Sequence, residues 1–271
     1  MAKDLIKYLL MEVKENMRVT LVQADLVWED PALNRLNLER LILRMDGESD
    51  VVFLPETFTT GFSVQTESLA EPMNGPTIDW LLSLSKKTNL AIGGSLLIRE
   101  DDRFFNRFVF IKPDGGISFY DKRHLFSIGG ESETITAGDQ RVVVNYLGWR
   151  IALYICYDLR FPVWCRNIAD TDLMIFSANW PDSRREVWNT LLKARAIENQ
   201  VYVAGVNRIG TDGEGLTYRG DSQMINARGE VMAINAPALN ELLTYRISKQ
   251  ELTDFLDKFP VANDADHFLI D

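Results

Sequence analysis

The chain has 271 residues, of which 46% are hydrophobic and 25% charged, so it can bury a large core and is not intrinsically disordered. Its 29 basic and 39 acidic residues give a net charge of −10, which disfavours nucleic acid and anionic membrane surfaces as partners because their phosphates would be repelled. Two cysteines in a chain of this length exclude a disulfide framework and predict a reducing, cytoplasmic location.

Residues 1–16 are expected to form an extension ahead of the first strand. Their apolar part is interrupted by Lys7 and Glu12. It is therefore too short for a membrane helix, which needs about 20 apolar residues, and no small-residue cleavage site of a signal peptide follows it. Residues 17–271 are predicted to form a single domain, because no linker, low-complexity segment or internal repeat divides them.

Strand and helix patterns alternate along the first half of the chain. An apolar, β-rich run predicts a strand at 17–25, and apolar residues at helical spacing after Pro31 predict a helix at 31–45. The remaining predicted elements of this half are a buried strand at 50–56, a helix at 76–88, and strands at 90–98, 105–112 and 116–120.

The second half continues the alternation. Two strands are predicted around Gly148 within 141–156, then a helix from Arg160 to Ala169. After a strand at 172–178, Ser183 and Glu186 have the spacing of a capping box that would open a helix ending at Gln200. Strands at 201–207, 220–226, 230–235 and 242–247 and a helix near 248–258 complete the chain. The pattern predicts an α/β or α+β fold with mixed sheets covered by helices.

Several common catalytic arrangements are missing from the sequence. It has no zinc-binding CxxC or HExxH motif, no P-loop, no GxGxxG and no GxSxG. A histidine-dependent hydrolase would have to use His124 or His267, and His267 lies too close to the C-terminus to be a well-fixed base. A histidine-dependent mechanism is therefore disfavoured.

Three reactive side chains follow predicted strands. Cys156 ends the strand IALYIC ahead of YDLRFP, a context that can hold a thiol near backbone N–H groups. Glu56 ends VVFLPE, and Lys122 follows ISFY. Each has an ordinary alternative interpretation, namely a small buried cysteine, a surface glutamate and a strand-exit lysine.

Taken together and in this order, LPE, DKRHLF and CYDLRFP resemble the nitrilase (carbon–nitrogen hydrolase) superfamily, and the similarity covers the chain after Met17. The segments LPETFTTGFS, YDKRHLF, ICYDLRFPVWCRN and GDS are most similar to the ω-amidase (YafV-type) branch, which hydrolyses the side-chain amide of 2-oxo acids such as 2-oxoglutaramate and 2-oxosuccinamate. The resemblance implies a four-layer α-β-β-α sandwich that associates as a homodimer or a higher homo-oligomer.

The resemblance also implies a role for each polar residue. Cys156 would attack the amide carbon, Glu56 would carry the proton, and Lys122 would stabilise the oxyanion. A second glutamate of the family lies seven residues before a glycine, which selects Glu131 ahead of Gly138, with Glu133 close enough to be confused with it. The backbone N–H of Tyr157 is the expected second oxyanion donor. The acyl-enzyme would be a thioester.

A substrate that carries a carboxylate needs a cationic or hydrogen-bonding anchor near the nucleophile. Arg160, four residues after Cys156, is the nearest candidate, although it could instead pair with Asp158. Phe62, Phe126 and Trp180 could wall the pocket or belong to the core. Cys165 is interpreted as an inert helix residue.

No metal or organic cofactor is expected, because each chemical role has a side chain. Two alternative functions stay open. One is an amidase or N-carbamoyl hydrolase of the same superfamily with another small substrate. The other is a nitrilase-like fold that serves as a binding module without catalysis.

Overall fold

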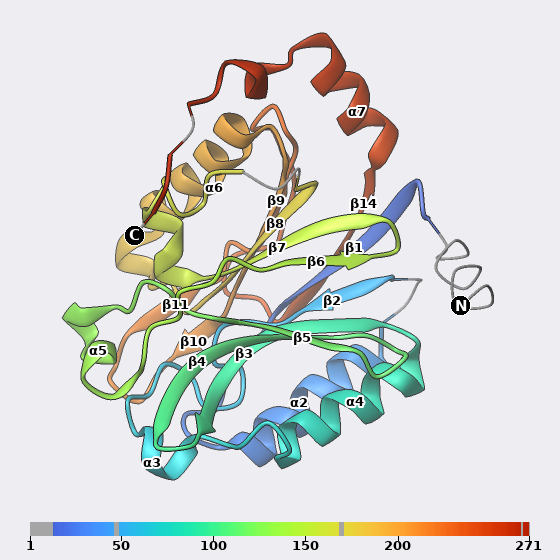
Figure 1. Ribbon diagram of the computed structural model, residues 1–271. Helices are drawn as coiled ribbons and strands as arrows, with labels where there is room; N and C mark the ends of the chain where they lie inside the picture. The colour runs from blue at the N-terminus through green and yellow to red at the C-terminus, as the bar shows by residue number, and fades with distance from the viewer. Residues whose placement is uncertain (1–12, 46–48, 168–170, 267, 271) are drawn as a thin grey trace, which may run out of the picture.

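The computed structural model of the protein describes residues 13–45, 49–167, 171–266 and 268–270. Within them, two six-stranded sheets face each other, and helices cover the outer face of each sheet (Figure 1). The predicted four-layer α-β-β-α sandwich is confirmed.

The first sheet has the strand order β14-β1-β2-β3-β4-β5. Strands β1 to β3 run parallel to one another, while β14, β4 and β5 join antiparallel. Its strands are β1 Asn16–Gln23, β2 Val51–Phe53, β3 Ala91–Glu100, β4 Arg103–Ile111, β5 Ile117–Asp121 and β14 Glu241–Ser248. Helices α2 (Pro31–Leu43) and α4 (Pro76–Thr88) cover its outer face, as Figure 1 shows.

The second sheet has the order β13-β12-β9-β8-β7-β6 and the same plan, with three parallel strands, β7 to β9, flanked by antiparallel ones. Its strands are β6 Val143–Tyr146, β7 Trp149–Ile155, β8 Leu173–Ala178, β9 Tyr202–Asn207, β12 Gln223–Ile225 and β13 Val231–Ile234. Helices α6 (Arg185–Asn199) and α7 (Lys249–Lys258) lie on its side of the sandwich (Figure 1).

The core explains why the central strands are apolar on both faces. In β2, Val51 and Phe53 enter the core between the two sheets, whereas Val52 packs with Leu54 under α2 and α4. Successive strand residues point to opposite faces, and here both faces are buried, so the sequence VVFL has no polar position.

The helix predicted from Arg160 to Ala169 is wrong. Residues Cys156–Arg160 form a 3-10 turn, η2, and 161–167 continue as irregular turns; 168–170 lie outside the described residues. The N–H of Asn167 donates to the side chain of Asn199 at 2.8 Å instead of to its own turn.

The predicted capping box is also wrong. Ser183 lies inside a 3-10 turn, η3 (Asp182–Arg184), and α6 begins only at Arg185, without a side-chain cap. The strand predicted at 220–226 is shortened to β12 because Gly220 and Asp221 have positive φ values of 82° and 55°, which break the extended conformation.

Several short elements were not predicted. They are α3 (Thr66–Leu69), η1 (Ser127–Gly129), α5 (Glu131–Thr134), the two-stranded ribbon of β10 (Ile209–Thr211) and β11 (Thr217–Arg219), and η4 (Val261–Asp264). In the described part of the chain, no helix has the length and apolar character needed to cross a membrane.

The end of the predicted N-terminal extension contacts the sandwich. Lys14 forms an ion pair of 2.9 Å with Asp50, and Trp149 Nε1 donates to the Lys14 carbonyl oxygen at 2.9 Å. Strand β1 begins at Asn16, one residue before the predicted boundary, and residues 1–12 lie outside the described residues.

Candidate active site

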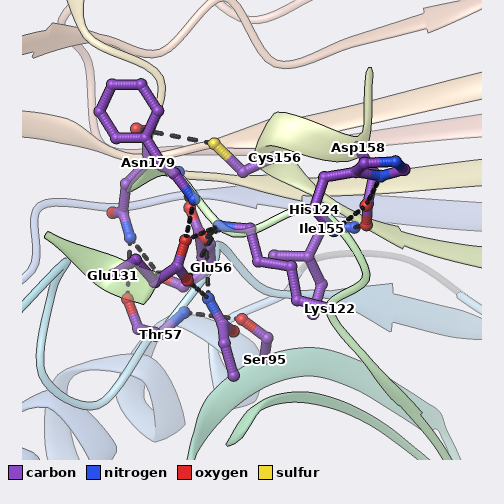
Figure 2. Close-up of polar contacts among 12 residues, drawn as sticks. Glu56, Thr57, Ser95, Lys122, His124, Glu131, Ile155, Cys156, Asp158 and Asn179 are labelled. Atoms are coloured by element: carbon purple, nitrogen blue, oxygen red, sulfur yellow. Dashed lines mark hydrogen bonds and ion pairs between the residues drawn. The ribbon is translucent and has the colours of Figure 1, made fainter. Parts of the chain in front are cut away.

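Three charged side chains meet where strands of the first sheet end. Lys122 follows β5, Glu56 follows β2, and Glu131 opens α5. The Lys122 Nζ atom lies 2.7 Å from Glu56 Oε1 and 2.8 Å from Glu131 Oε2 (Figure 2). All three side chains are at most 1% exposed. Such a buried cluster is tolerable only because each charge has close, opposite partners.

Neutral donors fix the two carboxylates in place. Asn106 Nδ2 donates to Glu56 Oε1 at 2.9 Å and to Glu131 Oε1 at 3.0 Å. The backbone N–H of Asn179 donates to Glu56 Oε2 at 2.8 Å, and that of Phe126 to Glu131 Oε2 at 2.7 Å. Both carboxylates therefore have a single orientation.

Glu131 is buried in this cluster, whereas Glu133 is exposed, so the geometry separates the two glutamates that the sequence left close together. The glycine seven residues later has a steric role. Gly138 N donates to the Lys122 carbonyl oxygen at 2.9 Å, and a Cβ atom at Gly138 would lie only 2.3 Å from the Asp121 carbonyl oxygen. The glycine lets the segment after Glu131 return beside the lysine.

Cys156 comes from the second sheet, at the end of β7 and the start of η2. Its φ of 42° is unusual for a residue with a side chain and marks a sharp, strained turn. The Sγ atom is 4.0 Å from the Asn179 carbonyl oxygen, and Figure 2 shows it facing the Glu56–Lys122–Glu131 cluster. The three predicted strand ends thus converge on one place.

Burial and the neighbouring Glu56 carboxylate raise the pKa of the Cys156 thiol well above its ordinary value, and the Lys122 ammonium only partly offsets this. The resting group is therefore the thiol, which has to lose its proton to act as a nucleophile.

For Lys122, burial alone would lower the pKa, but the Glu131 and Glu56 carboxylates outweigh burial and raise it. The lysine is a permanent cation at this site and cannot be a general base.

A cavity of about 360 Å³ opens in front of Cys156 and Lys122. This is within the usual size range for a small-molecule site. All four residues predicted to bind substrate line it, namely Arg160, Phe62, Phe126 and Trp180, and Tyr157 lines it as well. The aromatic residues are pocket walls rather than only core residues.

Arg160 does not pair with Asp158. Its guanidinium lies over the Trp180 ring at 5.2 Å, and no carboxylate forms an ion pair with it in the described ranges. Asp158 instead accepts hydrogen bonds from Tyr120 Oη at 2.7 Å and from the backbone N–H of Ile155 at 3.0 Å. The cation is left facing the cavity.

His124 is not positioned as a catalytic base. Its ring stacks on Phe161 with centroids 3.7 Å apart, and its Nδ1 lies 2.8 Å from Asp158 Oδ1. The contact joins the chain after Lys122 to the turn after Cys156, on the side of Lys122 away from Glu56 and Glu131 (Figure 2).

Sequence reasoning missed four residues of the site: Asn106, Asn179, Arg184 and Tyr218. Arg184 and Tyr218 line the cavity, and Arg184 lies over the Phe126 ring at 5.2 Å. Asn106 and Asn179 had a weak signal, because each is a polar residue within or directly after an apolar strand. Arg184 had none.

In the described portions of the chain, no three His, Cys, Asp or Glu side chains are grouped so that they could hold a metal ion.

Comparisons with known proteins identify the family of the chain. The model of the carbon-nitrogen hydrolase family matches residues 18–255. The chain is 44% identical to omega-amidase YafV of Yersinia enterocolitica, covering 94% of this chain and 98% of that one. It is 30% identical to 2-oxoglutaramate amidase of Bacillus subtilis, covering 91% and 96%.

Among solved structures, a CN-hydrolase superfamily protein of Xanthomonas campestris, with an arsenic adduct in its active site, superposes with a TM-score of 0.93 at 42% identity, covering 95% of this chain and 100% of that one. The fold, the matched residues and these identities lead to one conclusion: the chain belongs to the carbon–nitrogen hydrolase (nitrilase) family, in its YafV-type ω-amidase branch, and is an amidohydrolase.

Proposed function

We propose that the protein is an ω-amidase that releases ammonia from the side-chain amide of small 2-oxo acids, 2-oxoglutaramate and 2-oxosuccinamate, through a thioester on Cys156. The observation that carries this proposal is the cluster of Glu56, Lys122 and Glu131 beside the thiol, next to a cavity lined by Arg160 and Arg184, which form no ion pair with any residue that the structure describes. Relatives named omega-amidase and 2-oxoglutaramate amidase support the substrate class.

The first half-reaction forms the thioester. Glu56 takes the Cys156 proton as the sulfur attacks the amide carbon, and the oxyanion develops beside the Lys122 ammonium and the Tyr157 N–H. Glu56 then gives the proton to the leaving nitrogen, so that ammonia departs. This proton transfer suits a thiol whose pKa is raised by burial and by Glu56, because no free thiolate is needed.

In the second half-reaction, water attacks the thioester carbonyl carbon. Glu56 takes a proton from the water, and the C–S bond breaks as the proton returns to sulfur. Glu131 holds Lys122 in place through both of its carboxylate oxygens, at 3.0 and 2.8 Å. Its role is therefore to orient the cation rather than to transfer protons.

The mouth of the cavity suits the other end of the substrate. Arg160 and Arg184 each lie over an aromatic ring, which leaves the edges of their guanidinium groups available to oxygen atoms. A 2-oxo acid offers a carboxylate and an adjacent carbonyl in one plane, which a guanidinium can bind at two points. The walls between mouth and floor include Phe62, Phe126 and Trp28 and suit a short methylene chain.

A substrate panel tests the proposal. Ammonia release is measured for 2-oxoglutaramate and 2-oxosuccinamate, for N-carbamoyl amines and for simple aliphatic amides. We expect the oxo-acid amides to be the best substrates and Cys156→Ala to be inactive but folded. Fast turnover of a carbamoyl compound with no reaction of the oxo acids would instead establish the superfamily alternative, and normal turnover by Cys156→Ala would refute the nucleophile.

A mass spectrum after reaction tests the thioester directly. Acid quenching during turnover should leave an acyl group on the peptide that contains Cys156, and not on the peptide with the buried Cys165. We further propose that the enzyme works in the cytoplasm and forms a homodimer or higher homo-oligomer. Light scattering on the purified protein measures the molar mass of this assembly. A monomer at all concentrations would contradict this assembly.

A further inference from the structure

The side-chain amide of Asn106 lies between the two carboxylates of the site. Its Nδ2 atom donates one hydrogen bond to Glu56 and one to Glu131, at 2.9 and 3.0 Å. The residue is 1% exposed and is not among the residues that line the cavity. Its contacts are therefore with the catalytic cluster and not with a bound substrate.

The register of the sheet places Asn106 beside the lysine. Arg107 pairs with Asp121 across β4 and β5, and the backbone N–H of Lys122 donates to the Asn106 carbonyl oxygen at 3.0 Å. Directly opposite residues of antiparallel strands project to the same face. Asn106 and Lys122 thus reach the same two carboxylates from neighbouring strands.

The orientation of the amide is fixed by its neighbours. If the amide oxygen and nitrogen exchanged places, the oxygen would face two carboxylate oxygens and repel both. In the orientation observed, Asn106 Oδ1 has no hydrogen-bond partner in the described part of the chain. Burying an amide oxygen without a hydrogen-bond partner costs free energy. The two hydrogen bonds that the Asn106 amide nitrogen donates to the carboxylates offset this cost.

Neutral donors matter to this cluster because its charges do not balance. Two carboxylates surround one ammonium, and the Cys156 thiol also faces them. Two like charges this close repel each other, and hydrogen bonds donated to both carboxylates offset that repulsion. Asn106 donates to both at once.

We propose that Asn106 is a positioning residue that holds the Glu56 and Glu131 carboxylates together and correctly aimed, so that Glu56 can accept the proton of Cys156. This inference rests on the proposed function, in which Cys156 is the nucleophile and Glu56 the base.

The test compares the wild type with Asn106→Ala and Asn106→Asp. Two rates are followed from pH 5 to 9: ammonia release from 2-oxoglutaramate, and alkylation of Cys156 by iodoacetamide, read by mass spectrometry. Each rate is expected to fall toward low pH, and this falling part of the profile is called the acid limb. In Asn106→Ala we expect both acid limbs to move up by about one pH unit, with kcat/KM about 10-fold lower at pH 6. KM should change little, because Asn106 does not line the cavity.

Asn106→Asp keeps the size of the side chain, and circular dichroism establishes that each variant is folded before its rates are compared. Asn106→Asp removes the two donors and adds a third acid, so its limb should move at least as far as that of the alanine variant. The matched control is Asn235→Ala. Asn235 is 2% exposed, its Oδ1 also has no partner in the described residues, and its amide reaches a carboxylate outside the site, that of Glu241 at 3.4 Å. Its substitution should leave both limbs at the wild-type pH.

Two outcomes separate this inference from the proposed function. If both folded Asn106 variants keep the wild-type limbs while oxo-acid amides are hydrolysed, Asn106 only fills space and the inference fails alone. If no oxo-acid amide reacts but the alkylation limb still moves in the variants, the substrate proposal fails and the positioning role of Asn106 is supported.

Discussion

The floor of the cavity and its mouth are built in opposite ways. At the floor, Glu56, Lys122 and Glu131 are at most 1% exposed and are held by several hydrogen bonds each. At the mouth, Arg160 and Arg184 are partly exposed, rest on aromatic rings and form no ion pair within the described ranges. The floor is organised before a substrate arrives, whereas the cations of the mouth are left for the substrate. The difference suggests that the floor sets the chemistry and the mouth selects the amide.

The largest effect is expected at Lys122, where catalysis and folding depend on the same cation. Lys122→Met should lower kcat by roughly 1000-fold, because the oxyanion loses its charged partner. It should also lower the free energy of unfolding by about 3–5 kcal/mol, because two buried carboxylates lose their counterion. Ammonia release and urea denaturation measure the two effects. A stable Lys122→Met protein would show that the floor is less tightly coupled than its geometry indicates.

Glu56→Gln should lower kcat by about 100- to 10,000-fold, because the amide has nearly the same shape but cannot accept the thiol proton. KM should stay close to the wild-type value, since glutamine keeps the shape of the side chain and its hydrogen-bonded position in the cluster. Steady-state kinetics at neutral pH separate the two parameters. A change in KM alone would mean that Glu56 binds the substrate and does not carry the proton.

At the mouth the expected pattern is reversed. Arg160→Gln and Arg184→Gln should each raise KM for 2-oxoglutaramate by about 10- to 100-fold, the value of one charge-assisted hydrogen bond, with a much smaller change in kcat. The control is a neutral aliphatic amide, whose kcat/KM neither substitution should reduce. An equal loss of kcat/KM for charged and neutral amides would mean that these arginines maintain the cavity walls and do not bind the substrate carboxylate.

The buried Cys165, outside the active site, gives the prediction with the smallest expected effect. Burial raises the pKa of the Cys165 thiol well above its ordinary value, and the Asp158 carboxylate raises this pKa further. The folded state therefore favours the protonated thiol. The corresponding stability is fully present below the unfolded pKa of about 8.5 and is lost as pH rises above it.

Cys165→Ala should consequently flatten the decline in stability between about pH 8.5 and 10, by up to about 1.4 kcal/mol per pH unit. Thermal melts at several pH values measure the slope. The wild type at neutral pH supplies the reference, and an unchanged slope in Cys165→Ala would show that other buried groups dominate alkaline unfolding.

The sequence located the strand ends well because their signals are local. Helix α4 lies at the predicted residues 76–88, and the PDGG turn joins β4 to β5 as expected. The helix at 160–169 failed for a non-local reason, since the Asn167 N–H is taken by Asn199, on α6. Asn106 shows the same limit within the site: a lone asparagine in RFFNRFVFI reveals that a polar group is buried, but not which carboxylates it bonds.

By itself, the sequence determined the alternation of strands and helices, the apolar faces, and the reactive groups at three strand ends, because propensity, periodicity and motif order are properties of neighbouring residues. Only the tertiary structure decided that Glu131 rather than Glu133 joins the cluster, that Arg160 faces the cavity, and that Arg184 and Asn106 belong to the site. Those outcomes depend on strand register and on the packing of one sheet against the other, which bring together residues distant in sequence.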